Sequence, residues 1–246
     1  MVILTGKTIK SALKPPYPYG GEFVQQFLFG LKLCWFPLIV TSVAFGFGAP
    51  GLQAANFATL FGAIDRLGGF FVLSTIREAG PFVTAIIVAG VAGTAITADL
   101  GARKIREELD ALAVLGVDAI KNLVVPRFLA LMLITGLFNV FALLFGVSGG
   151  IVATLVFHEP LGPFWATFFT NASVTDLWGS LIKTTLFGAI IAIICCYKGM
   201  SAEGGAEGVG RAVNQAVVMA LITVFAFNYV FTQTLLATHP EITQIK

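Results

Sequence analysis

The sequence predicts an all-α integral membrane protein with five transmembrane helices. Of its 246 residues, 57% are hydrophobic and only 11% are charged, whereas a soluble domain carries about 25% charged residues. The mean hydropathy of +0.90 agrees with this composition. Its apolar stretches are long enough for helices rather than barrel strands to cross a bilayer. The net charge of +2 gives no indication of nucleic-acid binding, because the basic residues are spread thinly between the spans.

The N-terminal part is expected to lie on the cytoplasmic side. Residues 1–21 form a basic lead, in which three lysines and the following prolines argue against a signal peptide. Residues 22–33 are expected to form a short amphipathic helix on the membrane surface. The alternative is that they are the beginning of the first span. Their apolar stripe consists of Phe23, Phe27 and Leu31.

Five apolar stretches follow, and their flanking charges predict an orientation. Eleven of the fifteen basic residues fall on the side of the N-terminus if that end is cytoplasmic, so the positive-inside rule favours a cytoplasmic N-terminus and an external C-terminus. The aromatic loop at residues 158–176 is expected at the membrane interface, where tryptophan is favoured. The spans are expected at about residues 33–64, 70–98, 128–157, 177–197 and 212–237.

The second span carries a ridge of small residues. Ala85, Ala89, Gly93 and Thr97 recur at every fourth position. Such a ridge allows another helix to approach closely. The alternative is chance, since small residues are common in membrane helices.

A charged segment, residues 99–127, separates the second and third spans. Within it, residues 103–115 are expected to form an amphipathic helix, with Ile105 and Leu109 on its apolar face. The other face is acidic, which suits a protein partner better than anionic lipid. The alternative is a solvated connector.

Arg77 and Glu78 are two adjacent charges inside an otherwise apolar segment. Charges in such a place are costly and indicate a functional site. They precede Gly80 and Pro81, so we expect a helix break at which the charges could meet a phosphate or carboxylate headgroup. The alternative is a membrane-edge anchor or an intramolecular salt bridge.

No catalytic or metal-binding pattern is found in the sequence. The two histidines are isolated and the three cysteines suggest neither a disulfide framework nor a metal site. The glycine-rich turn at residues 198–211 follows a membrane helix and lacks the P-loop pattern. A lipid-modifying membrane enzyme would need a base, nucleophile or metal, and a channel or proton-coupled carrier would need more ionisable groups within the spans. Both remain as candidate functions.

Several long strings carry a resemblance to a known family. They are REAGPFVT (77–84), AGVAGTAITADLGA (89–102), IREELDALAVLGVD (105–118), VPR (125–127) and KGMSAEGGAEGVGRAVN (198–214). The chain resembles the MlaE/YrbE permeases, the membrane subunits of ABC transporters that work with MCE-domain lipid-carrier proteins. Within the family it looks most like the A-type YrbE subunits, although its N-terminus is shorter and the Arg77–Glu78 pair is that of MlaE.

The resemblance implies a single permease domain over residues 22–246 and a non-catalytic function. The subunit would lie in the inner (plasma) membrane and would move a fatty acid, sterol or phospholipid across the cell envelope, by import. Its coupling helix, 103–115, would seat in a cytoplasmic ABC ATPase dimer that holds the ATP and Mg²⁺, and this chain would bind no cofactor. The expected contacts are Ile105, Arg106, Glu107, Glu108, Leu109, Asp110 and Leu112.

The resemblance also implies partners within and outside the membrane. A second permease subunit would pair with this chain, either a B-type paralogue or a second copy, and MCE-domain proteins would bind on the outer side. A lipid pocket would lie near the axis of the pair, lined by the first two spans. Its expected residues are Phe45, Leu52, Leu73, Ile76, Arg77, Glu78 and Phe82.

Overall fold

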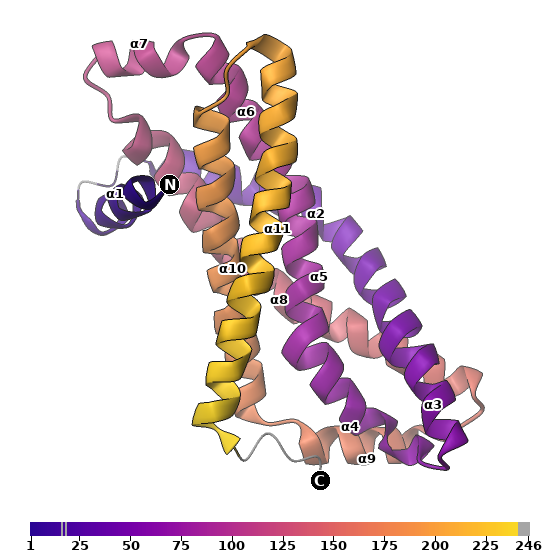
Figure 1. The fold of residues 1–246 in the computed structure, drawn as a ribbon. Coiled ribbons are helices and arrows are strands. Elements are labelled where there is room, and N and C mark those ends of the chain that lie inside the picture. Colours follow the sequence, from indigo (N-terminus) through magenta and orange to yellow (C-terminus); the bar gives the residue numbers. More distant parts are fainter. Residues whose placement is uncertain (16, 18, 241–246) are drawn as a thin grey trace. The chain divides into compact units, whose positions relative to one another are not determined.

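The computed structural model describes residues 1–15, 17 and 19–240, and all regular secondary structure in these residues is helical (Figure 1). Five helical stretches are long and apolar enough to cross a membrane. The predicted fold class is therefore confirmed, although the helices extend beyond most of the predicted ends. The five stretches are Gly20–Leu60, Ile64–Ile105, Ile120–Val156, Val174–Met200 and Gly205–Thr238.

Three of the spans are built from several helical segments, among which four are π-helical and widen the helix locally. The first span comprises α2 (Gly20–Gly46), the π-helical η1 (Phe47–Gln53) and α3 (Ala54–Leu60). The second comprises the 3₁₀ turn η2 (Ile64–Arg66), α4 (Leu67–Phe71), the π-helical η3 (Val72–Ala79), α5 (Gly80–Ile87), the π-helical η4 (Val88–Gly93) and α6 (Thr94–Ile105). The π-helical η5 (Ile120–Val124) and α8 (Val125–Val156) form the third, and α10 (Val174–Met200) and α11 (Gly205–Thr238) form the fourth and fifth.

Proline explains where two of these wide turns occur. Pro50 lies inside η1, and Pro81 is the second residue after the end of η3. A proline has no amide hydrogen, so the usual bond to the carbonyl four residues earlier is missing. The helix continues from the wide turns of η3 into α5, and the expected break at Gly80–Pro81 is wrong.

The chain divides into two compact units. The first unit contains residues 1–35, 85–135 and 185–226. Here the small-residue ridge is buried and lies against α10: Thr97 Oγ1 donates a hydrogen bond to the Cys195 carbonyl at 3.3 Å. A Cβ atom at Gly93 would lie only 2.8 Å from Cys195 Sγ. The absence of a side chain at Gly93 therefore permits the close approach of these helices.

The second unit contains residues 36–84, 136–184 and the C-terminal end of the described chain from residue 227. Its core is an apolar cluster in which Phe71 and Phe164 make an edge-to-face contact with ring centroids 5.6 Å apart. Phe164 belongs to α9 (Leu161–Asn171), which packs on α4 (Figure 1). The loop expected at residues 158–176 is thus largely helical. Pro160 and Pro163 suggested a loop, yet they lie at the N-cap and in the first turn, where a helix does not need the amide hydrogens.

The N-terminal region also differs from expectation. Residues 22–33 are not a separate interfacial helix, because α2 runs without interruption from Gly20 to Gly46. The alternative, that they begin the first span, describes the structure. The basic lead contains a helix that the sequence reading did not include, α1 (Val2–Leu13).

Candidate functional sites

The segment between the second and third spans forms two helices rather than one. α6 ends at Ile105, and α7 spans Glu108–Val114. Between them Glu107 has φ +59°, a left-handed conformation that ends a right-handed helix. The expected continuous helix 103–115 is therefore wrong, since its apolar spacing does not reveal the turn at Glu107.

A glycine ends α7. Gly116 has φ +72°, its N–H bonds to the Ala113 carbonyl, and the Val117 N–H bonds to the Leu112 carbonyl. This is the Schellman arrangement, which satisfies the last carbonyls of a helix. The left-handed residues Glu107 and Gly116 therefore end the helix on both sides. As a result, α7 projects as a separate short helix (Figure 1).

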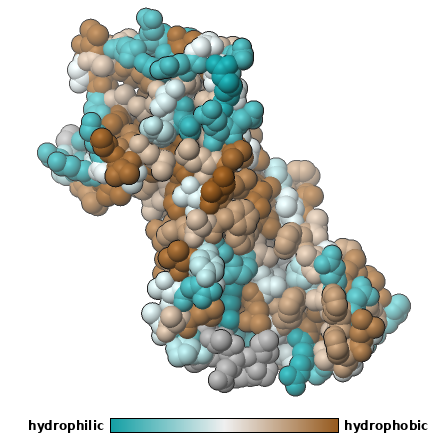
Figure 2. Space-filling model, viewed as in Figure 1, coloured by the Kyte–Doolittle hydropathy of each residue, from teal (hydrophilic) through white to brown (hydrophobic). Residues whose placement is uncertain are grey.

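The surface of α7 is polar on one side and apolar at its end. Leu109 is buried, Asp110 is exposed, and Leu112 is half-buried. Two exposed ion pairs, Lys104–Asp110 at 3.1 Å and Arg106–Glu108 at 2.7 Å, cover the polar side. Hydrophilic side chains gather over this α6–α7 end of the first unit (Figure 2).

The apolar end of α7 was not among the expected contact residues. Val114 is 89% exposed and Leu115 is 75% exposed. Exposed large apolar side chains beside charged ones are typical of a protein interface. The signal in the sequence was the run of apolar residues that ends before Gly116.

A buried arginine joins three helices next to this region. The Arg127 side chain has no exposed surface; it contacts Asp99 Oδ2 at 2.7 Å and Glu22 Oε1 at 3.2 Å. It also donates to the Leu123 carbonyl at 2.8 Å. Glu22, Asp99 and Arg127 come from α2, α6 and α8, so this cluster fixes three spans to one another within the first unit. Sequence reasoning did not find it, because the three residues are far apart in the chain.

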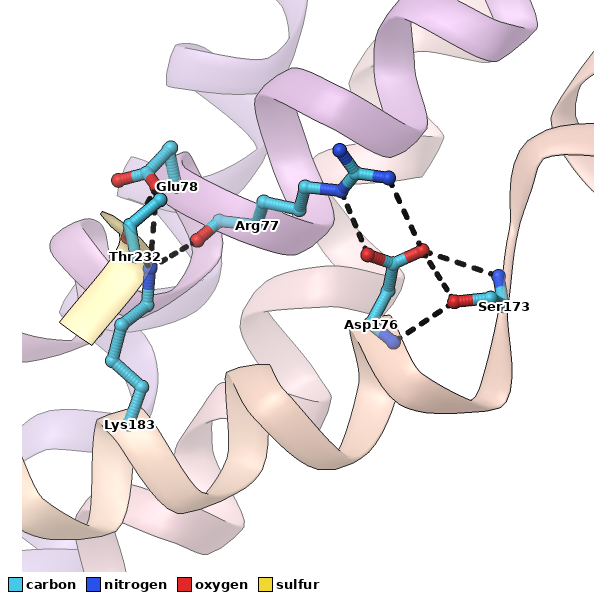
Figure 3. A network of polar contacts seen from close by, with 6 residues as sticks. All are labelled: Arg77, Glu78, Ser173, Asp176, Lys183 and Thr232. Carbon is cyan, nitrogen blue, oxygen red and sulfur yellow. Dashed lines mark hydrogen bonds and ion pairs between the residues drawn. The ribbon is translucent and has the colours of Figure 1, made fainter. Parts of the chain in front are cut away.

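In the second unit, Arg77 forms an ion pair with Asp176 (Figure 3). Arg77 Nε donates to Asp176 Oδ1 at 2.7 Å, and Asp176 is buried. Asp176 also completes a capping box at the start of α10: Ser173 N and Oγ donate to Asp176 Oδ2 at 3.3 and 2.7 Å, and Asp176 N donates to Ser173 Oγ at 3.1 Å. One carboxylate thus caps a helix and neutralises the arginine of another span.

Glu78 has its own set of partners (Figure 3). Lys183 Nζ lies 3.4 Å from Glu78 Oε1, Thr232 Oγ1 donates to the same oxygen at 2.9 Å, and Asn228 Nδ2 donates to Oε2 at 2.8 Å. Lys183 also donates to the carbonyl of Arg77, the group that the proline four residues later cannot bond. The adjacent charges therefore link the second span to the fourth and the fifth.

The intramolecular salt bridge, one of the alternatives for Arg77 and Glu78, is what the structure contains. Asp176, Asn228 and Thr232 were missed as their partners; the only local signal was the S-x-x-D spacing of Ser173 and Asp176. Buried pairs of this kind are favourable only when their remaining hydrogen-bonding groups are also satisfied, and Figure 3 shows how serine and threonine hydroxyls do this.

The other residues expected around a lipid pocket have different surroundings. Ile76 is 3% exposed and belongs to the apolar core of the second unit. Phe45 is exposed and lines a cavity of about 10 Å³, which has room for one water molecule rather than a lipid. Leu52, Leu73 and Phe82 are half-buried.

Metal and catalytic chemistry receive no support from these sites. Among the described residues, no group of three or more His, Cys, Asp or Glu side chains could hold a metal ion. The expectation that this chain carries no cofactor stays a prediction.

The fold and these sites define a multi-pass helical membrane protein with paired charges inside its spans and a charged projection between the second and third. Its sequence matches the model of the family described as Permease MlaE over residues 23–234. The chain belongs to the MlaE permease family.

Relatives from three organisms agree with this assignment. The chain is 38% identical over 183 residues to a probable ABC transporter permease protein of Synechocystis sp., covering 72% of the chain and 68% of that protein. It is 34% identical over 228 residues to a probable ABC transporter permease protein of Rickettsia typhi, covering 92% and 87%. It is 32% identical over 182 residues to the chloroplast protein trigalactosyldiacylglycerol 1 of Arabidopsis thaliana, covering 74% and 52%. The chain is thus a permease subunit of an ABC transporter, which implies a membrane location and a separate ATPase partner.

Proposed function

We propose that this permease moves a lipid across the cell envelope, by import, driven by a cytoplasmic ATPase dimer that docks on α7. The ATP and Mg²⁺ belong to the ATPase, and this chain is non-catalytic. The substrate class is a fatty acid, sterol or phospholipid. The observation that supports a lipid is the similarity to the Arabidopsis protein, whose name is that of a galactolipid.

The docking role of α7 is supported by its surface. The polar side carries Glu107 and the ion-paired carboxylates of Glu108 and Asp110, and Val114 and Leu115 supply exposed apolar area. Charged residues around an apolar centre are the usual composition of a protein interface. The positive-inside count supports a cytoplasmic location for α7, with the N-terminus inside and the C-terminus outside.

The paired charges suggest which parts move. Arg77 and Glu78 tie the second span to the fourth and fifth in the second unit, because breaking such pairs in an apolar environment is costly. The most exposed spans are the first and the fifth. We infer that the ion-paired spans move as one body, whereas the first span changes its position and opens a lipid site. ATP can drive this change only if the free energy of ATP binding differs between the two states, and the change can take up or release the lipid only if the lipid binds the two states with different affinity.

Two further partners complete the proposal. The exposed apolar surface of the first span, which includes Phe45, would be covered by a second permease subunit, either a B-type paralogue or a second copy. MCE-domain proteins outside the inner (plasma) membrane would receive or deliver the lipid. Phe45, Leu52 and Leu73 would then face the lipid in the open state.

Charge reversal on α7 tests the docking. In the Glu107→Lys/Glu108→Lys variant we expect the ATPase to be lost from the purified complex and lipid transfer to stop, while the permease itself elutes as the wild type does. The matched control is Glu203→Lys/Glu207→Lys, which reverses two exposed acidic residues on another turn of the same predicted side. ATPase retained by the α7 variant would refute docking at this helix. If the control variant loses the ATPase to the same extent, the loss results from the change in net charge and not from docking at α7.

A further inference from the structure

The N-terminal helix α1 forms one wall of an apolar cavity in the first unit. The cavity has a volume of about 500 Å³, and its other walls come from α8, α10 and one residue of α11. On α1 the lining residues include Thr5, Ile9 and Leu13, which lie on one face of the helix. The opposite wall includes Phe128, Ala189 and Ile193.

The cavity leaves apolar side chains uncovered. Ile9 is 46% exposed and Leu13 is 75% exposed, although both line it. Cavities of 300–1,000 Å³ with mainly apolar walls are typical of ligand sites. The walls on α8 and α10 belong to membrane-spanning helices, so the substance next to this opening is lipid.

The charge on α1 lies away from the cavity. Lys7 and Lys10 are spaced three residues apart and are exposed, so they share the face opposite the lining residues. Lys14, the exposed C-cap residue, adds a third positive charge at the end of the helix. No acidic residue occurs among the first 21 residues. An amphipathic helix with such a basic face lies in the interface, with its apolar side toward the acyl chains and its lysines at the headgroups.

We propose that this cavity binds one acyl chain of an anionic phospholipid from the surrounding membrane. The chain enters between α1 and the α8–α10 wall, and the phosphate stays at the level of α1. The long lysine stems can follow the helix surface and bring their ammonium groups to the headgroup. The opposite charge of lipid and helix favours an anionic headgroup over a zwitterionic one. The site involves neither Arg77 nor Glu78, so it is independent of the proposed transport function.

Photo-crosslinking tests the proposal. The full chain is placed in phosphatidylcholine vesicles that contain a phosphatidylglycerol with a diazirine on its acyl chain, and the labelled peptides are mapped. We expect the label on α1 and on the facing residues of α8 and α10, and less label when phosphatidylcholine carries the same diazirine. For each lysine changed to glutamine on α1 the preference for phosphatidylglycerol should fall, by at most about fivefold.

Filling the cavity provides the matched pair of variants. Ala189→Phe places a ring in the cavity, whereas Ala226→Phe makes the same change at an exposed position of α11 outside it. Labelling of the cavity peptides should fall about tenfold in the first, equivalent to losing about two buried methylene groups, and should be unchanged in the second.

Two outcomes would overturn the proposal. They are label spread evenly over all exposed apolar helix faces, and equal labelling by both lipids. The label map of the unmodified protein decides between these outcomes and the proposal even if Ala189→Phe does not fold.

Discussion

The ion pair between Arg77 and Asp176 predicts a large and specific loss of stability in Asp176→Ala. The change removes the buried carboxylate from Arg77 and also the capping partner of Ser173. Leaving a buried charge without its partner costs about 3–5 kcal/mol, whereas the cap bond from the backbone N–H of residue 176 to Ser173 Oγ is kept. The expected loss is therefore roughly 3–5 kcal/mol, a large part of the 5–15 kcal/mol that stabilises a typical protein.

Two companion variants separate the cap from the charge. Ser173→Ala removes the cap alone and should cost about 1 kcal/mol. Arg77→Met combined with Asp176→Leu replaces both charges by apolar side chains of similar size, which is often nearly neutral. The double variant should therefore be more stable than Asp176→Ala, although it lacks twice as many native charges.

The free energy of unfolding is measured in detergent micelles by tryptophan fluorescence, since Trp165 and Trp178 lie in the same unit as the pair. If Asp176→Ala lowers the free energy of unfolding by no more than Ser173→Ala does, the ion pair with Arg77 contributes no stability and the reasoning fails. If the double variant is as unstable as Asp176→Ala, packing rather than charge explains the loss.

Three further predictions concern positions where the structure is tightly determined. A Cβ atom at Gly46 would lie 2.2 Å from the Gly146 carbonyl oxygen, so Gly46→Ala should destabilise by about 1–3 kcal/mol. Gly48→Ala is the control, because it has open space and should be neutral or slightly stabilising in the same unfolding assay. Glu107→Gly should raise the melting temperature and Glu107→Val lower it, since only glycine adopts a positive φ without strain; equal melting temperatures would mean that the turn is not left-handed. A polar maleimide should label the cysteines only after denaturation, as judged by mass spectrometry, because all three are free and buried: Cys34, Cys195 and Cys196.

The helical periodicity of the sequence was reliable for spans and unreliable for the short elements between them. A span needs about 20 apolar residues, a signal that no other structure imitates. The segment after Ile105 has only a few residues in each helix, so the same apolar spacing fits one continuous helix or two helices with a turn at Glu107. Likewise Pro160 and Pro163 predicted a loop, because a proline in the first turn of a helix and a proline in a loop look alike in sequence.

The sequence predicted the charged residues of the second-span site but not their partners. The sequence singled out Arg77 and Glu78, because a charge inside an apolar segment has a high free-energy cost and therefore indicates a special role. It did not supply Asp176, Asn228 or Thr232, which lie about 100 to 150 residues away in the chain. Such contacts depend on how helices pack, and no local pattern contains that information.

Composition and chain order by themselves determined that this protein is a five-span helical membrane protein with a charged segment between its second and third spans. Backbone hydrogen bonding in an apolar medium leaves few other choices. The tertiary structure alone decided that the paired charges satisfy one another, that Arg127 joins three helices, and that α1 forms one wall of an apolar cavity. These features arise when residues from different helices meet, and their energies depend on distances that a sequence does not state.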